Sequence, residues 1–122
     1  MNTYTKSERL KSRKLIDQLF EEGLSFNKYP LRVVYCPNPQ SEISLHQTMF
    51  VVPKKRFKSA VDRNLIRRRM LEAYRLNKNI LYHKQPVTPY LIAYIYIGKE
   101  IADYQMVEEK LKVAMLRLVN EA

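Results

Sequence analysis

The first periodic block of apolar residues lies between Ser12 and Gly23 and predicts a short helix. Ile16, Leu19 and Phe20 recur at intervals of three and four residues, which places them on one face of a helix. Ser12 is a suitable N-cap because its hydroxyl can accept a hydrogen bond from a free backbone N–H of the first turn. Gly23 is typical of the position that follows a helix.

Shorter apolar runs predict strands, and the last of them has a pattern of its own. It is almost continuously apolar and aromatic, which is typical of a strand buried on both faces. The segment Pro37–Glu42 contains prolines and an asparagine, and we expect it to close a hairpin between the strands on either side. The predicted extended segments are Ser25–Lys28, Leu31–Cys36, Leu45–Val52 and Tyr90–Ile97.

Two longer helices complete the pattern. Ser59, with Asp62 three residues later, is typical of a helix N-terminus, and this helix is predicted to run to about Ile80. Asp103 is the predicted cap of a final helix. The apolar stripe of that helix consists of Val107, Leu111, Ala114, Met115 and Leu118.

The order of these elements, α-β-β-β-α-β-α, predicts an α+β sandwich in which helices cover one mixed sheet. No repeat or linker divides the chain, so we expect residues 1–122 to form a single domain. The strands before and after the helix at 59–80 can pair in parallel, and general sterics alone favour a right-handed crossover between them. Residues 1–11 are polar and basic, and we interpret them as an N-terminal arm in which Leu10 turns inward.

Most of the excess positive charge lies in about a fifth of the chain. Residues 54–78 contain ten Lys or Arg residues against only Asp62 and Glu72, a net charge of +8 in a chain whose net charge is +10. A helical projection separates most of these arginines from an apolar side of Leu65, Ile66, Met70, Ala73 and Leu76, with Tyr74 at its margin. The candidate phosphate-binding residues are Lys54, Lys55, Arg56, Arg63, Asn64, Arg67, Arg68 and Arg75.

A solvated helix face is the ordinary interpretation of such a charge run. Here, however, carboxylates are almost absent at the i±4 positions that would compensate the arginines, so the arginines repel one another. Guanidinium groups bind phosphate oxygens in a bidentate manner. A nucleic acid is therefore the favoured partner.

The composition agrees with this interpretation. A chain of 122 residues with 46% hydrophobic residues favours a folded domain over a disordered basic tail. The single cysteine, Cys36, cannot form an internal disulfide, and no segment has the pattern of a secretion signal or a membrane span. We therefore expect a cytoplasmic protein. A membrane surface fits the charge less well because the cationic helix lacks a bulky aromatic face.

Residues for protein-borne catalysis are missing from the pattern. His46 and His83 are far apart in polar contexts, and we expect both at the surface. Adjacent glutamates such as Glu21 and Glu22 diverge on a helix, so they do not form an acid–base pair. No Cys/His metal spacing and no glycine-rich phosphate loop is present in the sequence.

The basic segment also resembles the protein subunit of bacterial ribonuclease P. Two positions depart from the family pattern: Leu65 replaces the second arginine of an Arg-Asn-Arg core, and Leu71 replaces an arginine before the glutamate. We expect Leu65 to pack inward and Leu71 to be exposed amid the arginines. The residues that carry the resemblance are Lys54, Lys55, Ala60, Val61, Arg63, Asn64, Arg67, Arg68, Glu72 and Ala73.

This resemblance implies a function. In that family the RNA subunit performs the hydrolysis with Mg²⁺, and the protein binds both the catalytic RNA and the 5′ leader of precursor tRNA. No cofactor in the protein and no protein partner is implied. The corresponding cleft for the leader would include Ile16, Phe20 and Tyr35. From the residues alone, an ordinary core face of the helix and a half-buried tyrosine of the sheet are the alternatives. The family has a left-handed crossover between its parallel strands, and we expect the same crossover here.

Other classes of function remain open at this point. A general RNA-binding module, similar to a ribosomal protein, would bind RNA without assisting precursor cleavage. A DNA-binding protein could use residues 59–80 as a recognition helix, but such a helix normally follows another helix and a turn, and here it follows a strand. A protein enzyme is the weakest hypothesis because no catalytic constellation can be assembled.

Overall fold

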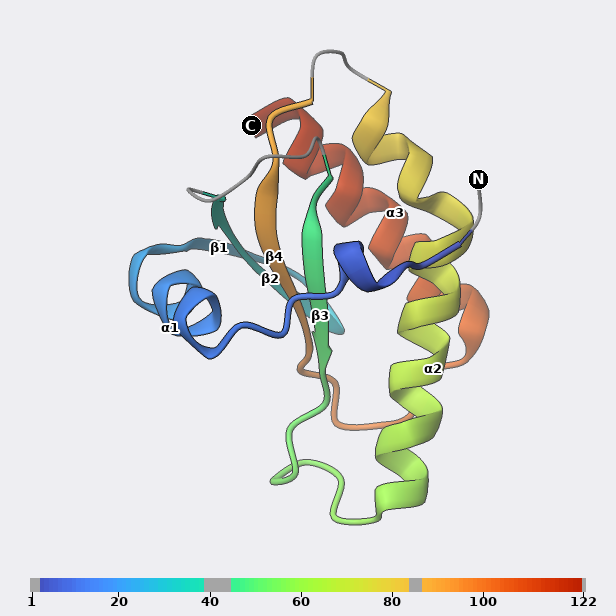
Figure 1. The fold of residues 1–122 in the computed structure, drawn as a ribbon. Coiled ribbons are helices and arrows are strands. Elements are labelled where there is room, and N and C mark those ends of the chain that lie inside the picture. The colour runs from blue at the N-terminus through green and yellow to red at the C-terminus, as the bar shows by residue number, and fades with distance from the viewer. Residues whose placement is uncertain (1–2, 39–44, 84–86, 122) are drawn as a thin grey trace.

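The computed structural model describes residues 3–38, 45–83 and 87–121, which form three α-helices around one four-stranded sheet (Figure 1). The predicted order of elements and the single mixed sheet are confirmed. Two short 3-10 helices are η1 (Lys6–Glu8) and η2 (Lys78–Tyr82). The helices are α1 (Arg13–Glu22), α2 (Ala60–Asn77) and α3 (Tyr104–Glu121), and the strands are β1 (Leu24–Lys28), β2 (Leu31–Pro37), β3 (Gln47–Val51) and β4 (Tyr90–Tyr96).

Strand β4 lies inside the sheet, between β2 and β3. The strand order is β1-β2-β4-β3, with β4 antiparallel to β2 and parallel to β3. The predicted parallel pair is therefore confirmed, whereas the predicted hairpin between β2 and β3 is wrong, and β1 and β2 form a hairpin instead. The reason is that β4 is apolar on both faces, so an inner position buries most of its side chains. Most of the loop Pro37–Glu42 lies outside the described residues, and the left-handed crossover stays a prediction.

Different helices cover the two faces of the sheet. In Figure 1, α1 lies on one side of the strands, and α2 and α3 lie on the other. Along β2, Val33 and Tyr35 belong to the core under α2 and α3, whereas Val34 and Cys36 belong to the core under α1. Successive side chains of a strand point to opposite faces. Odd-numbered and even-numbered residues of β2 therefore face different helices.

The predicted helix starts are confirmed by side-chain hydrogen bonds. Ser12, Ser59 and Asp103 each accept a hydrogen bond from a backbone N–H of the following turn, at 3.3, 3.5 and 2.9 Å. Gly23 ends α1 as predicted, but its backbone is extended and not left-handed. Glycine is needed there because a Cβ would lie 2.4 Å from the carbonyl oxygen of Leu19.

Helix α2 is rotated relative to the projection made from the sequence. Its buried residues are Ile66, Met70, Ala73 and Tyr74. Because the Tyr74 ring lies fully in the core and not at its margin, Leu76 turns toward solvent and is 40% exposed. Leu71, predicted to be exposed, is half-buried for the same reason, and Leu65 is half-buried as well. The α-helix ends at Asn77, and the chain continues as η2.

The N-terminal arm, residues 3–12, crosses the outer edge of β3 (Figure 1). Leu10 is buried as predicted, and its N–H donates to the carbonyl of Thr48 at 2.9 Å. Glu8 is 4% exposed and forms an ion pair with Lys78 at 2.5 Å. A backbone hydrogen bond and a buried ion pair together hold this arm against the rest of the protein.

Candidate nucleic-acid interface

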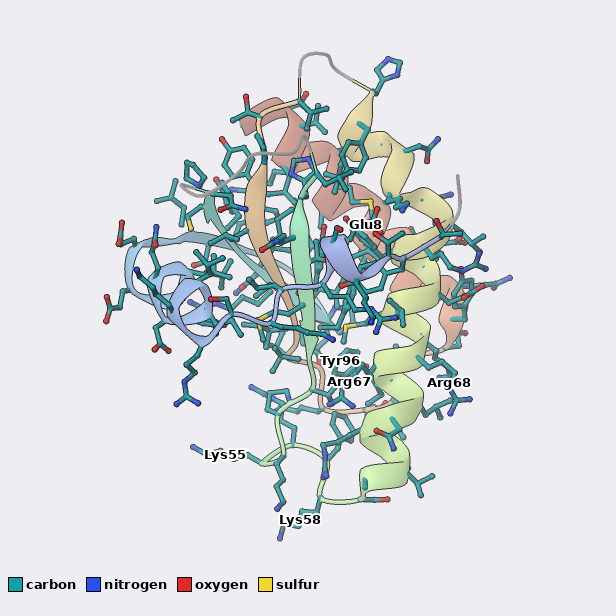
Figure 2. The ribbon with its side chains drawn as sticks, viewed as in Figure 1. Glu8, Lys55, Lys58, Arg67, Arg68 and Tyr96 are labelled. Atoms are coloured by element: carbon teal, nitrogen blue, oxygen red, sulfur yellow. The ribbon has the colours of Figure 1, made fainter. Side chains whose placement is uncertain are left out.

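The cations between β3 and α2 lie on a tight turn, which we call the basic loop (residues 53–59). The N–H of Arg56 donates to the carbonyl of Pro53 at 3.1 Å, and the buried Phe57 ring lies 5.8 Å from the ring of Tyr96. Figure 2 shows labelled lysines of this loop extending away from the body of the protein. The exposed cations, whose side chains have no hydrogen bond or ion pair within the described ranges, are Lys54, Lys55, Arg56 and Lys58.

Arg63, in the first turn of α2, holds the basic loop in position. Its Nη1 donates to the carbonyls of Phe57 at 2.8 Å and Lys58 at 2.9 Å. Part of its guanidinium group is therefore occupied inside the protein. The structure gives Arg63 a positioning role for the loop, and its predicted contact with phosphate remains a prediction.

The next turn of α2 carries Asn64, Arg67 and Arg68. The Arg67 Nη1 donates to the Asn64 amide oxygen at 3.1 Å. Arg68 is exposed and has no partner among the described residues. Figure 2 shows Arg67 on the side of α2 that faces β3 and Arg68 on the opposite side. The two guanidinium groups therefore extend the positive surface in two directions from the basic loop.

The C-terminal half of α2 differs because its charge is compensated. Arg75 makes two hydrogen bonds to the carboxylate of Glu72, Nε to Oε2 at 3.1 Å and Nη2 to Oε1 at 2.5 Å. These hydrogen bonds hold the pKa of Glu72 below its usual value. Arg69 donates to the carbonyl of Ala102 at 2.6 Å. The expected lack of carboxylate partners is wrong at Arg75, and the free cations gather at the start of the helix.

Only part of the predicted leader cleft comes together. Ile16 and Phe20 both belong to α1, where Ile16 packs on the core under that helix and Phe20 is 48% exposed. Tyr35 is buried on the opposite face of the sheet, with its ring 5.9 Å from Phe26 and 6.1 Å from Tyr90. The proposal of one surface made by Phe20 and Tyr35 is therefore wrong. Side chains alternate between the two faces of the sheet along β2, and those of Val33 and Tyr35 point away from α1.

A row of residues that the sequence pattern did not indicate lies on the α1 side of the sheet. In the strand register Asn27 pairs with Arg32, Arg32 with Ile95, and Ile95 with Val51. We call these four residues the open row, because they are exposed or half-buried, whereas in the next rows Val34, Cys36, Leu91 and Ala93 are buried under α1. The parity of Val34 in β2 and of Ala93 in β4 would have indicated this row if the pairing of the strands had been known.

His46 is not at the surface, which corrects its prediction. It is 5% exposed, its Nδ1 accepts a hydrogen bond from the N–H of Tyr90 at 3.0 Å, and its ring lies 4.9 Å from that of Tyr82. Burial lowers the pKa of His46 to about 4. Through its contacts with Tyr82 and Tyr90, the neutral side chain of His46 connects the ends of β3, η2 and β4. It is therefore not available as a base for a substrate.

Neither a metal site nor a membrane-spanning helix is found in the described parts of the chain. No three His, Cys, Asp or Glu side chains within residues 3–38, 45–83 and 87–121 come close enough to hold a metal ion. None of the helices in these ranges has the length and apolar character that a membrane span requires. The features that characterise the described chain are the exposed cations of the basic loop and of the start of α2, and the open row of the sheet.

These features define a class: small, basic α+β proteins in which a mixed sheet presents fixed cations at one end. The family described as Ribonuclease P matches residues 4–119. The chain is 37% identical over 118 residues to the ribonuclease P protein component of Porphyromonas gingivalis, covering 95% of this chain and 86% of that protein. It is 36% identical over 83 residues to the same component of Chlorobaculum tepidum, covering 66% of this chain and 54% of that protein.

Solved structures show the same fold. The RNase P protein from Thermotoga maritima superimposes with a TM-score of 0.73 and 28% identity, covering 90% of this chain and 96% of that one. The RNase P protein of Staphylococcus aureus gives a TM-score of 0.70 over 93% of this chain and 95% of that one, at 23% identity. The chain belongs to the ribonuclease P protein family.

Proposed function

We propose that this protein is the protein component of a ribonuclease P, in which an RNA subunit carries out the Mg²⁺-dependent removal of the 5′ leader of precursor tRNA. Membership of the family supports the class of activity. The observation that carries the proposal is the basic loop, whose four exposed cations have no partner within the described ranges. No described group of side chains could hold the metal ions, so the proposal assigns them to the RNA.

The basic loop and the first turns of α2 bind phosphates of the catalytic RNA in this proposal. Arg67, Arg68 and Asn64 extend the loop's surface, and Arg63 holds the loop in place. Arg75 contributes less because Glu72 offsets its charge. Neutralising about four to seven phosphates would lower the repulsion between two RNA chains and make binding steeply dependent on salt.

The α1 side of the sheet binds the single-stranded leader. Phe20 offers an exposed ring on which a base can stack, with a contribution of roughly 1–3 kcal/mol per base. Ile95 and Val51 of the open row are half-buried apolar side chains, and Arg32 adds a cation beside them. Binding the leader here would position the scissile phosphate near the metal ions of the RNA, which is an effect of proximity.

The RNA-binding part of the proposal is tested with two arginines of the same helix. Arg68→Ala removes a free guanidinium, and Arg75→Ala removes one that Glu72 already compensates. We expect Arg68→Ala to weaken binding to a bacterial ribonuclease P RNA by roughly threefold to tenfold and to lower the slope of log K against log salt by about 0.7–0.9. Arg75→Ala should change the affinity by less than about twofold. Equal losses of RNA affinity in the two variants would contradict the proposal that Arg68 contributes more to phosphate binding than Arg75.

The leader-binding part is tested with Phe20→Ala. Affinity for the catalytic RNA alone should stay unchanged, while affinity of the complex for a precursor with a leader should fall by about fivefold or more, as loss of one stacked base predicts. Binding to tRNA without a leader is the control. A general RNA-binding module, the second candidate, would bind RNA with a similar salt dependence but would not stimulate cleavage.

A further inference from the structure

A second group of cations lies away from the basic loop and α2. Residues 6–14 contain one acidic residue, Glu8, which is buried and paired with Lys78, so it does not offset the charge at the surface. The exposed cations of this segment are Lys6, Arg9, Lys11, Arg13 and Lys14. We call them the arm cations. They form a positive surface that the proposed function has not used.

The backbone that carries most of these cations is fixed. The Tyr4 hydroxyl and the Leu10 N–H both donate to the carbonyl of Thr48, at 2.8 and 2.9 Å. The Arg9 guanidinium lies 5.4 Å from the centre of the Tyr4 ring. Cations on a fixed backbone lose less conformational freedom on binding than cations on a flexible tail. This arrangement suits a binding surface.

Two of the arm cations lie at the end of α1 where the helix dipole disfavours positive charge. Arg13 and Lys14 occupy the first turn, where the helix dipole favours acidic residues, and that turn contains none. Arg13 lies 3.8 Å from Asp17, but both side chains are more than half exposed, so water screens the pair. A sequence selected for stability alone would place acidic residues there. The cost to the helix indicates a partner that carries negative charge.

The position of the arm selects the kind of partner. The arm crosses β3 at Thr48 and leads directly into α1, which carries Phe20, while the basic loop begins at Pro53 beyond the other end of β3 (Figure 1). Thr48 and Pro53 are five positions apart in the sequence, which corresponds to roughly 17 Å of extended backbone. A polyanionic strand bound along this face would therefore meet cations at both ends.

We propose that the arm cations form a second site for single-stranded RNA, which binds the part of the 5′ leader that extends beyond Phe20 and the open row. This inference rests on the proposed function. A single strand fits better than a duplex because the arm cations follow one short stretch of chain, from η1 to the first turn of α1, and not a broad surface. Each cation would neutralise about one phosphate.

The experiment compares precursor tRNAs with leaders of 3 and 12 nucleotides, bound to the assembled RNA–protein complex. The test variant is the triple change Lys6→Gln, Lys11→Gln and Lys14→Gln. The matched control removes the same charge from α3 and from the loop that precedes it, with Lys99→Gln, Lys110→Gln and Lys112→Gln. Affinities are measured at two salt concentrations, and circular dichroism checks the folding of each variant.

We expect the arm variant to lose about tenfold in affinity for the long leader and less than twofold for the short leader. Its salt slope with the long leader should fall by about 2, because three phosphates of a single strand are no longer neutralised. The control should show neither change. An equal loss with both leaders, or no loss with either, would overturn the inference. If the wild-type protein gives no gain in precursor affinity at any leader length, the proposed function itself fails, and the arm site fails with it.

Discussion

Lowering the pH from 7 to 5 should destabilise the fold through one buried histidine, His46. Its Nδ1 accepts a hydrogen bond from the N–H of Tyr90, and Tyr82 covers its ring. Burial raises the pKa of Tyr82 to about 12, so this neighbour stays neutral and offers no charge to a protonated ring. Protonation of His46 would remove the acceptor and place an unpaired charge inside the protein.

The magnitude follows from the pKa of His46, which burial lowers from 6.5 to about 4. The neutral form is favoured in the folded state, so its stabilising contribution is complete above pH 6.5 and is lost as the pH falls toward 4. This difference in pKa corresponds to roughly 3 kcal/mol in total. About 2 kcal/mol of it should be lost between pH 7 and pH 5.

Urea unfolding at pH 7, 6 and 5 measures this loss directly. His46→Asn keeps an amide oxygen near the position of Nδ1 but does not titrate, so its free energy of unfolding should change little over this range. His83→Asn, at an exposed position, is the matched control and should keep the wild-type dependence. Hydrogen bonds hold the pKa values of Glu72 and Glu108 below their usual range, so these carboxylates stay ionised throughout. A wild-type protein equally stable at pH 7 and pH 5, or an undiminished dependence in His46→Asn, would refute the reasoning.

Three further substitutions test the packing, each by chemical unfolding. Glu8→Leu leaves Lys78 buried without its carboxylate and should lower the free energy of unfolding by about 3–5 kcal/mol. The double variant Glu8→Leu with Lys78→Met should recover much of that loss. Equal losses in the two variants would contradict the role of the ion pair. Gly23→Ala places a methyl group 2.4 Å from a carbonyl oxygen and should cost about 1–3 kcal/mol, and an unchanged stability would show that the backbone yields. Tyr94→Phe removes a buried hydroxyl without a partner in the described structure and should be neutral or stabilising by about 1 kcal/mol; a loss would indicate a hidden hydrogen bond.

Local patterns in the sequence were sufficient where the interactions are local. Ser12, Ser59 and Asp103 cap their helices within three residues of their own positions, and the final apolar stripe needs only helical periodicity. The same reasoning predicted β4 as a strand buried on both faces. It also found the basic loop, because the exposure of several consecutive cations on a turn needs no tertiary information.

Features that depend on strand pairing could not be predicted in this way. The position of β4 between β2 and β3 decides which residues share a face, and no local signal specifies it. Tyr35 was therefore assigned to the wrong face, and Arg32 was not connected to Ile95 in the open row. His46 was predicted at the surface because the residues that bury it, at the ends of η2 and β4, lie far away in the sequence.

Side-chain pairing within α2 was the remaining difficulty. Arg75 was predicted to bind phosphate because no carboxylate lies four residues from it, whereas Glu72, three residues away, forms an ion pair with it. Arg63 was predicted to point outward, but two carbonyls of the basic loop accept hydrogen bonds from it. A helical projection shows which way a side chain points but not what it bonds to. It could not therefore separate the arginines with internal partners, such as Arg63 and Arg75, from those without.

The most direct test of the central proposal is cleavage of a precursor tRNA by a bacterial ribonuclease P RNA at low Mg²⁺, with and without this protein. We expect the protein to stimulate cleavage, Arg68→Ala to remove much of the stimulation, and Arg75→Ala to leave it nearly intact. The protein without the RNA should not cleave the precursor. Tight binding to the RNA without stimulation, or cleavage by the protein alone, would contradict a role as the protein component of ribonuclease P.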